Sequence, residues 1–304
     1  MKKVLITGAA GFLGKECATL FKNSGFSVIT TDKVGHVDMQ GDLSNPDFAS
    51  LLPAVDVVIN CAAVQYVSKD LPFFFRERYF FKNNVLSAKN LSVRYRNDTH
   101  FIHVGTSMMY VQDGAEHFEG SSKFSGEGVY SKSKFQAQQY IDLIENSATV
   151  IPCIIGGRGR EGLFKGFVSL IQRFQFVIFP GNGLHAVHMV HVSDVSSLIL
   201  KIVQTTSTGF FNAASLNPLS IRQWVNEISQ GLKIKKVRIY SLPLFPFVFI
   251  SKIFDFRLLA KEQLLMLKLS HVLSLNKSLS IGWVPRYTNA DVAREIALHI
   301  ASEL

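Results

Sequence analysis

The residues TGAAGFLG at positions 7–14 follow a short apolar run, Val4–Thr7, and precede a helical pattern at Gly14–Ser24. Glycine at positions 8, 11 and 14 lets the backbone approach a bound pyrophosphate, which then lies at the positive end of the helix. A strand, a glycine turn and a helix in this order predict a dinucleotide-binding βαβ unit.

Asp32 follows the second apolar run, Ser27–Thr31, and is the acidic residue that such a unit needs. A carboxylate at this position accepts a hydrogen bond from a ribose hydroxyl and repels a ribose phosphate. We therefore expect NAD as the cofactor, while Lys33 beside Asp32 keeps NADP as an alternative.

Two further segments are candidates for cofactor contacts. Asp42 and Leu43, in GDLSNPDF, are placed to meet the adenine, although capping of the following helix is an equal interpretation of Asp42. Ala62 lies in the small-residue segment NCAA, residues 60–63, where a cofactor passes close to the backbone or where small residues simply pack.

Apolar runs alternate with helical patterns throughout the first half of the chain. The runs are Val4–Thr7, Ser27–Thr31, Val55–Asn60, Phe101–Val104 and Val150–Ile155, and the helical patterns are Gly14–Ser24, Lys82–Arg94 and Tyr130–Glu145. This alternation predicts an α/β fold of the Rossmann type, with a doubly wound parallel sheet. We expect a dinucleotide-binding domain at 1–155 and a smaller C-terminal substrate lobe at 156–304, with segments around 187–204 returning to the first domain.

Tyr130 and Lys134 lie one helical turn apart in YSKSK, on one face of the predicted helix. A free phenol has a pKa near 10, and a neighbouring ammonium lowers the pKa of the phenol, so Tyr130 can act as acid and base. Thr106 follows the run Phe101–Val104 and is expected at the same sheet edge, within reach of a reacting hydroxyl.

With these segments the chain resembles an extended short-chain dehydrogenase/reductase of the NAD-dependent epimerase/dehydratase type. The segments that carry the resemblance are TGAAGFLG, Asp32, NCAA, FKNNVLSAKNL, GTSMMY, YSKSK, MVHVSDV and FNAAS. The resemblance implies that Thr106, Tyr130 and Lys134 form a catalytic triad and that Lys134 also binds the nicotinamide ribose. It further implies a homodimer formed through the helices near Lys82–Arg94 and Tyr130–Glu145. The implied cofactor contacts are Gly8, Gly11, Phe12, Leu13, Gly14, Asp32, Asp42, Leu43, Ala62, Tyr130 and Lys134.

The chain departs from this family at positions that concern the substrate. Ser107 and Met108 replace the acidic residues that follow the catalytic Thr in sugar-nucleotide dehydratases, which disfavours dehydration. The segment Ile151–Ile154 lacks the Arg and Asn of many nucleotide-sugar members, and Val187 stands where those members tend to carry Arg. We expect Asn84, Arg158 and Arg160 to contact the substrate, the two arginines by clamping phosphates.

The segment Leu242–Leu275 is rich in Leu and Phe. Four cations are interspersed, namely Lys252, Arg257, Lys261 and Lys268. The mixture resembles family members that act on sugars attached to polyprenyl diphosphates, and members that act on sterols or other apolar alcohols. It fits docking at a membrane surface, where apolar side chains enter the lipid and cations meet acidic headgroups. The alternative is that these residues form the buried core of the small lobe.

Composition limits the remaining function classes. The 304 residues include 47% hydrophobic and 18% charged residues, as in a globular protein. The net charge of +9 favours anionic partners, yet no basic run with interleaved aromatics predicts nucleic-acid binding. Cys17, Cys61 and Cys153 form no CxxC pair, which argues against a disulfide framework and a zinc site and for a reducing compartment.

We expect no metal, because His185, His188 and His191 cannot converge on one strand face and no Cys or carboxylate completes a site. The longest apolar stretch, Leu242–Ile250, is too short to span a bilayer. A cytoplasmic location is expected, with peripheral contact at the inner membrane face if the Leu242–Leu275 segment docks on lipid.

The sequence therefore predicts an NAD(P)-dependent epimerase or oxidoreductase that moves hydride to and from a sugar hydroxyl carbon. The sugar is expected on a nucleotide or on a polyprenyl diphosphate. One alternative is a 3β-hydroxysteroid-dehydrogenase-like enzyme for apolar alcohols. Another, of a different class, is a non-catalytic Rossmann protein that senses nucleotides, which would have no need of the Thr106, Tyr130 and Lys134 set.

Overall fold

The computed structural model describes residues 1–68, 70–96, 98–160, 164–254, 256 and 260–303. A seven-stranded sheet forms its centre, in the order β12-β7-β5-β4-β1-β2-β3, and all neighbouring strands are parallel. The strands are β1 (Lys3–Thr7), β2 (Ser27–Asp32), β3 (Met39–Gln40), β4 (Val57–Asn60), β5 (His100–Val104), β7 (Ser147–Pro152) and β12 (Gly209–Ala213). The predicted Rossmann-type sheet is confirmed.

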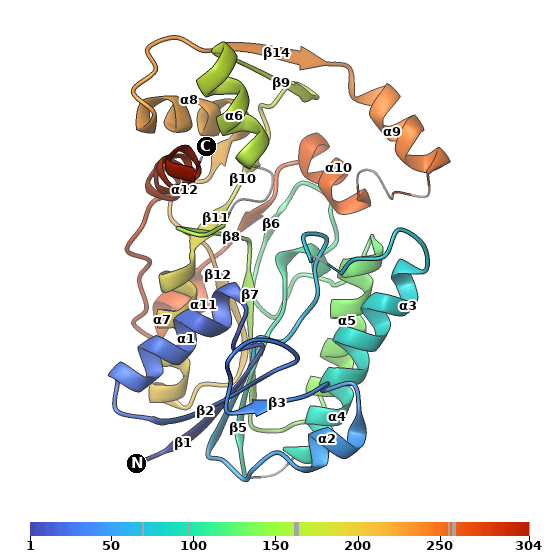
Figure 1. Ribbon diagram of the computed structural model, residues 1–304, viewed down its shortest axis with the longest axis vertical. Helices are drawn as coiled ribbons and strands as arrows, with labels where there is room; N and C mark the ends of the chain where they lie inside the picture. The colour runs from blue at the N-terminus through green and yellow to red at the C-terminus, as the bar shows by residue number, and fades with distance from the viewer. Residues whose placement is uncertain (69, 97, 161–163, 255, 257–259, 304) are drawn as a thin grey trace.

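Helices cover both faces of this sheet (Figure 1). On one face lie α1 (Phe12–Asn23) and α7 (Val192–Thr205), and on the other lie α2 (Pro46–Ser50), α4 (Ser87–Arg94) and α5 (Val129–Ile141). The middle of the central strand β1, Val4–Ile6, is apolar because it is buried on both sides. Val4 and Ile6 pack in the cluster with α1 and α7, whereas Leu5 packs in the cluster with α4 and α5.

A second apolar cluster lies beyond the carboxyl edge of the sheet, in the upper part of Figure 1. Its buried residues include Phe164, Trp224 and Ile296, which come from three different helices. The helices of this region are α6 (Phe164–Phe174), α8 (Ile221–Gly231), α9 (Leu244–Ile253), α10 (Lys261–Lys268) and α12 (Asn289–Glu303), whereas α11 (Asn276–Ser280) lies beside β12 of the main sheet. Its short strands are β8 (Ile154–Gly156), β9 (Phe176–Pro180), β10 (Ala186–Val187), β11 (Met189–His191), β13 (Leu219–Ser220), β14 (Arg238–Leu242) and β15 (Val272–Leu273), the last of which pairs with β6 (Glu116–His117).

Two segments differ from their predicted form. The helix expected at Lys82–Arg94 begins earlier, with α3 (Arg76–Phe80), and passes through a π-helical turn, η1 (Phe81–Leu86), before α4. The run Val150–Ile155 is two strands, because β7 ends at Pro152 and β8 pairs with β11 outside the main sheet. A proline cannot donate a ladder hydrogen bond, so it is a natural end for a strand.

The segment Leu242–Leu275 divides into two dissimilar helices. In α9 the apolar side chains are largely exposed, Phe245 by 76% and Ile253 by 64%, and the only buried residue is Ser251. In α10, by contrast, Glu262 and Leu264 are buried. The interpretation of the segment as lobe core is therefore wrong for α9. Within the part of the chain that the structure describes, no helix is long and apolar enough to cross a membrane.

Candidate active site

The glycine turn lies where the strand order reverses, between β1 and β4. Gly8 has φ +65°, and a Cβ there would lie 2.7 Å from the Cα of Ala62. A Cβ on Gly14 would lie 2.1 Å from the carbonyl oxygen of Gly8. Glycine is therefore required at both positions by backbone contacts alone. Gly11 is the N-cap residue of α1 and has no side chain. The first N–H groups of the helix therefore receive no side-chain hydrogen bond from the N-cap.

The turn fits a dinucleotide in two respects. A parallel sheet binds its ligands in the crevice outside the carboxyl ends of the strands, at the reversal point where Gly8 and Ala62 meet. The uncapped start of α1 offers backbone donors and a positive dipole to a pyrophosphate. Phe12 and Leu13 form the first turn of that helix, Leu13 being buried against the sheet.

Asp32 lies at the end of β2, next to the glycine turn. Its Oδ2 accepts a hydrogen bond of 3.0 Å from the backbone N–H of Ala10, and its Oδ1 accepts one of 2.6 Å from the N–H of Lys33. The carboxylate thus holds the turn in place and lies at the position from which ribose hydroxyls are bound.

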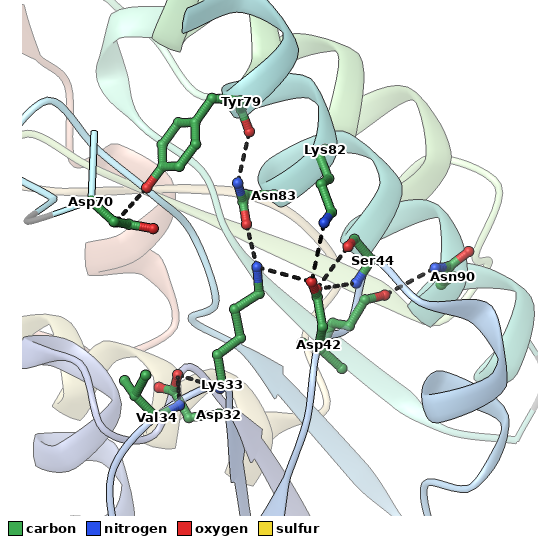
Figure 2. A network of polar contacts seen from close by, with 11 residues as sticks. Asp32, Lys33, Val34, Asp42, Ser44, Asp70, Tyr79, Lys82, Asn83 and Asn90 are labelled. Carbon is green, nitrogen blue, oxygen red and sulfur yellow. Dashed lines mark hydrogen bonds and ion pairs between the residues drawn. The ribbon is translucent and has the colours of Figure 1, made fainter. Parts of the chain in front are cut away.

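Lys33 does not stay beside Asp32. Figure 2 shows its side chain extending to Asp42 and Asn83, with the Nζ at 3.2 Å from Oδ2 of Asp42 and donating to Oδ1 of Asn83. Asn83 is held in turn, because its Nδ2 donates to the carbonyl oxygen of Tyr79 over 2.8 Å. The cation that could have met a ribose phosphate is therefore engaged elsewhere.

Asp42 is the centre of this polar network (Figure 2). Its Oδ1 accepts from the N–H and the hydroxyl of Ser44, and Oδ2 faces Lys33 and Lys82. Burial alone would raise the pKa of Asp42, but the Ser44 hydrogen bonds and Lys33 outweigh it, so the pKa of this carboxyl is lowered. The interpretation of Asp42 as a helix cap is wrong, because Asn45 caps α2 by accepting from the N–H of Asp47.

Of the remaining predicted contact residues, Ala62 lies at the crevice beside the glycine turn, whereas Leu43 and Asn84 are buried in the protein. Ala62 borders Gly8 and is partly exposed, whereas Leu43 is buried and its carbonyl oxygen accepts from Asn90. Asn84 is buried in the π-helical turn, where it bonds the backbone of Val64 through both of its polar atoms and donates 2.9 Å to the Ser133 hydroxyl. Its amide is hydrogen-bonded inside the protein, and the substrate contact expected of Asn84 stays a prediction.

Tyr130 and Thr106 meet at the carboxyl end of β5, and the Lys134 side chain reaches the last residue of that strand, Val104. Thr106 follows β5, and its hydroxyl, which accepts from the N–H of Met108, lies beside the Tyr130 phenol. Burial raises the pKa of Tyr130 to about 12, while Thr106 and then Arg160 act to lower it and Glu262 acts to raise it. The cation that lowers the pKa of the Tyr130 phenol is thus Arg160, whereas the sequence predicts Lys134 in this role.

Lys134 points beneath the phenol, into the sheet. Its Nζ donates 2.6 Å to the carbonyl oxygen of Val104 and lies 3.4 Å from Nε2 of His103. Burial lowers the pKa of Lys134 to about 8. Burial, and then the Lys134 charge, hold the pKa of His103 well below its usual value. The ammonium is therefore easy to deprotonate, as a proton carrier close to neutral pH must be.

A row of polar side chains supports Lys134 from three adjacent strands. The sheet register aligns Thr7 with Asn60 and Asn60 with His103. The Thr7 hydroxyl donates 2.7 Å to Oδ1 of Asn60, and Nδ2 of Asn60 lies 3.1 Å from Nδ1 of His103. The sequence analysis missed this row. Its signal was a polar residue at the end of each of three neighbouring apolar runs.

The two arginines of GGRGREG have different surroundings. Arg160 donates 2.8 Å to Oε1 of Gln65, lies over the Phe12 ring at 5.8 Å and acts on the Tyr130 phenol. Arg158 is exposed, and its backbone N–H donates to Glu295. Only Arg160 therefore joins the glycine turn to the phenol.

Two of the three histidines singled out in the sequence, His188 and His191, have structural partners. Nδ1 of His188 accepts from the N–H of Leu273, and His191 caps α7 by accepting from the N–H of Ser193. Among the described residues, no group of three or more His, Cys, Asp and Glu side chains is placed to hold a metal ion.

Comparison with known proteins places this geometry in a family. The model of the NAD dependent epimerase/dehydratase family matches residues 4–214, more than half of the chain. The spore coat polysaccharide biosynthesis protein SpsK of Bacillus subtilis is 26% identical over 207 residues, which cover 66% of this chain and 70% of SpsK.

Solved structures share the whole fold. The UDP-glucuronic acid 4-epimerase of Bacillus cereus, solved with NAD, superposes with a TM-score of 0.78 at 17% identity and 99% coverage of each chain. A dTDP-4-dehydrorhamnose reductase from Clostridium acetobutylicum gives a TM-score of 0.76 at 19% identity, again with 99% coverage of each chain. At these identities the likeness establishes the fold.

Proposed function

The chain belongs to the NAD dependent epimerase/dehydratase family, and from this premise we propose that it moves hydride between NAD and a hydroxyl-bearing carbon of a sugar. The observation that supports the proposal is that Thr106 lies beside the Tyr130 phenol at the carboxyl end of β5, where Lys134 donates to the carbonyl oxygen of Val104. A protein that only sensed nucleotides would need the turn and not this set.

Each residue of the set has a distinct task. Tyr130 exchanges the proton of the substrate hydroxyl, and Thr106 orients that hydroxyl from the other side. Lys134 holds the nicotinamide ribose and, with a pKa of about 8, passes protons to and from the phenol. When bound, NAD would supply the hydride acceptor for the carbinol carbon and, in an epimerase, the hydride donor for the opposite face of the ketone.

NAD is favoured over NADP by the surroundings of the ribose. Asp32 supplies a negative charge at the end of β2, where a 2′-phosphate would lie. The ammonium of Lys33, which could have offset that charge, is bound by Asp42 and Asn83. We propose that Gly8, Gly11, Gly14, Ala62 and the first turn of α1 hold the pyrophosphate, and that Asp42 and Leu43 border the adenine.

Two observations favour a sugar carried on a polyprenyl diphosphate over a free nucleotide sugar. First, the Arg and Asn of many nucleotide-sugar members are missing from Ile151–Ile154. Second, α9 projects from the margin of the molecule with Phe245, Phe249 and Ile253 exposed (Figure 1). An amphipathic or apolar surface helix with nearby cations docks at a lipid interface. Arg160, beside the phenol, is the candidate ligand for the first phosphate.

The cations near α9 are not equivalent. Lys252 and Lys268 are exposed, whereas Lys261 pairs with Glu127 at 2.7 Å, and Arg257 lies outside the described residues. Exposed cations are the ones available to acidic headgroups. The same surface would also serve a 3β-hydroxysteroid-dehydrogenase-like enzyme, the second candidate, since its apolar alcohol would come from the membrane.

A homodimer is also part of the proposal. The groove between α3, η1 and α5 is lined by Arg78, Phe81, Val129, Lys132 and Gln136. Phe81 is 42% exposed there, which leaves apolar surface for a second copy to cover.

One experiment distinguishes between these candidate substrates. Mass spectrometry of the purified protein should find retained NAD, and a panel of nucleotide sugars, polyprenyl-diphosphate sugars and hydroxysteroids should then be assayed for epimerisation and for NADH formation. Turnover of the lipid-linked sugar alone supports the full proposal. Turnover of UDP-sugars alone confines it to soluble substrates, and NADH release from a hydroxysteroid replaces it with the second candidate. A protein without NAD binding or turnover would leave the proposal without support.

The membrane contact has its own test. The protein should sediment with vesicles containing anionic lipid at low salt, and less at high salt, because headgroup attraction is screened over about 8 Å at physiological ionic strength. The double substitution Lys252→Gln with Lys268→Gln should reduce sedimentation, and Lys261→Gln, which removes an ion-paired cation, is the control. A protein that stays in the supernatant at low salt contradicts docking.

A further inference from the structure

The C-terminal half of the chain delivers a carboxylate to the start of the helix that carries Tyr130. Glu262 lies in α10, more than a hundred residues after α5, and is only 2% exposed. A buried carboxylate is costly unless it is fully hydrogen-bonded. The hydrogen-bond partners of Glu262 therefore indicate its structural role.

Three donors satisfy the Glu262 carboxylate. Its Oε1 accepts 3.0 Å from the N–H of Ser131 and 2.9 Å from the Ser131 hydroxyl. Its Oε2 accepts 3.0 Å from the hydroxyl of Tyr66. The Ser131 hydroxyl in turn accepts 2.9 Å from the N–H of Gly128, which is the N-cap residue of α5. The carboxylate thus substitutes for a cap that glycine, which has no side chain, cannot provide.

Tyr66 extends the same arrangement to the catalytic residue. Its oxygen accepts 3.2 Å from the backbone N–H of Tyr130, and its ring contacts the Tyr130 ring edge-on, with centroids 5.8 Å apart. Phe80 completes the aromatic contact at 5.8 Å from the Tyr130 ring. Glu262 and Tyr66 together therefore hold the N–H groups of Tyr130 and Ser131, the residues that set where the phenol points.

Gly128 leaves room for this carboxylate and for nothing larger. A Cβ on Gly128 would lie 1.9 Å from Oε2 of Glu262. The φ of Gly128 is −116°, which any residue can adopt, so a side chain here would displace the carboxylate and would not strain the backbone.

We propose that Glu262 is a positioning residue for the hydride-transfer reaction, which fixes the backbone of Tyr130 through Ser131 and Tyr66. The inference rests on the proposed function for the meaning of Tyr130 and adds a residue from the C-terminal segment to its machinery. It also makes the phenol sensitive to α10, because displacement of that helix removes the hydrogen bonds at the start of α5.

Hydrogen exchange tests the geometry without any substrate. In Glu262→Ala and in Gly128→Ala, the amides of Tyr130 and Ser131 should exchange at least about tenfold faster than in the wild type, because each loses a hydrogen bond or its support. Tyr66→Phe should release only the Tyr130 amide. NAD affinity should stay within about twofold, since the glycine turn is untouched. Unchanged exchange at both amides in Glu262→Ala would overturn the inference, whatever the substrate proves to be.

Activity on the substrate found in the panel adds the functional test. Small displacements of a catalytic group are costly, so Glu262→Ala and Gly128→Ala should lower kcat by about tenfold or more. Their KM should change little.

The pH profile separates positioning from general damage. The charged groups that act on the Tyr130 phenol are Arg160 and Glu262, with Lys134 on the same helix. Glu262→Gln keeps the shape and removes the negative charge, so the acid limb of kcat/KM for oxidation should move to lower pH by about half a unit or more. The matched control is Glu127→Gln, which breaks the part-buried 2.7 Å ion pair with Lys261 between the same two segments. Equal losses at every pH in both variants would overturn the positioning role.

Discussion

The glycine turn at residues 7–14 and the segment Leu242–Leu275 serve one proposed site in opposite ways. In the turn, Gly8 and Gly14 are fixed by backbone atoms less than 3 Å from where a side chain would begin. In the C-terminal segment, function lies in side chains: a buried Glu262 on α10 and exposed phenylalanines on α9. The turn therefore depends on positions without a side chain, whereas the C-terminal segment depends on the contacts and exposure of its side chains.

The difference explains why the two regions are unequally predictable. The turn is recognisable from eight consecutive residues, although Ala62 and Asp32 also contact it. Glu262, in contrast, bonds residues from two other parts of the chain, Tyr66 and Ser131. We therefore expect substitutions in the turn and its helix to act on binding and chemistry. Those in the C-terminal segment should act on positioning and docking.

The largest effect should come from Tyr130→Phe. The ring stays among Tyr66 and Phe80 while the proton carrier disappears, so turnover should fall by about a hundredfold to ten-thousandfold. NAD binding should persist, as measured by cofactor fluorescence. Tyr140→Phe on the same helix is the control and should retain full activity. Near-normal turnover in Tyr130→Phe would contradict the assignment of the phenol.

The buried histidines His188 and His271, which lie next to β15, should destabilise the folded protein at low pH. Burial lowers the pKa of His188 to about 4, and burial with the charges of His117 and His188 lowers the pKa of His271 to about 3. The unfolded chain binds protons near pH 6.5 and the folded chain only below these values, so stability is full above pH 6.5 and falls as pH drops. From pH 7 to 5 we expect a loss of roughly 2 to 4 kcal/mol of unfolding free energy in urea titrations.

His271→Leu sharpens that prediction. Both ring nitrogens of His271 lack a hydrogen-bond partner among the described residues. An apolar side chain of similar size should therefore cost little at pH 7 and should flatten the loss toward pH 5. A pH dependence as steep as that of the wild type would show that His271 does not titrate in this range.

How far the sequence predicted the site depended on how local each contact is. The turn, Asp32 and Thr106 could be placed from the ends of parallel strands, and Thr106 lies beside Tyr130 of α5. The cation acting on the phenol could not be predicted, because Arg160 reaches it from a loop after β8 and Lys134 is drawn down to Val104. The spacing of Tyr130 and Lys134 predicts that both lie on the same face of the helix. It does not predict where the long Lys134 side chain places its ammonium group.

A smaller effect is expected at Asp32. Asp32→Ala should weaken NAD binding by about tenfold, equivalent to 1.4 kcal/mol, and shift the preference toward NADP, because a hydroxyl acceptor and a negative charge are lost together. Asp32→Asn, which can still accept from the N–H of Ala10, separates the charge from the support of the turn. Lys33→Ala should leave the preference unchanged, since Asp42 and Asn83 already hold Lys33. Titration of both cofactors decides these points. An NADP affinity that depends on Lys33 would contradict the expected diversion of its side chain.

The smallest effect on stability is expected in α9, and it tests whether this helix is a surface. Phe245 is 76% exposed, so Phe245→Ser should change the free energy of unfolding by no more than about 0.5 kcal/mol. Phe211, fully buried in β12, is the matched residue of the sheet, and Phe211→Ser should cost about 3 kcal/mol or more. The two phenylalanines share a side chain and differ in surroundings, so the contrast isolates burial. If Phe245→Ser also lowers sedimentation with anionic vesicles while stability is unchanged, the apolar side chains of α9 are used outside the molecule. A loss of several kcal/mol at Phe245 would instead mean that α9 packs against this chain in solution, and the case for membrane docking would be lost.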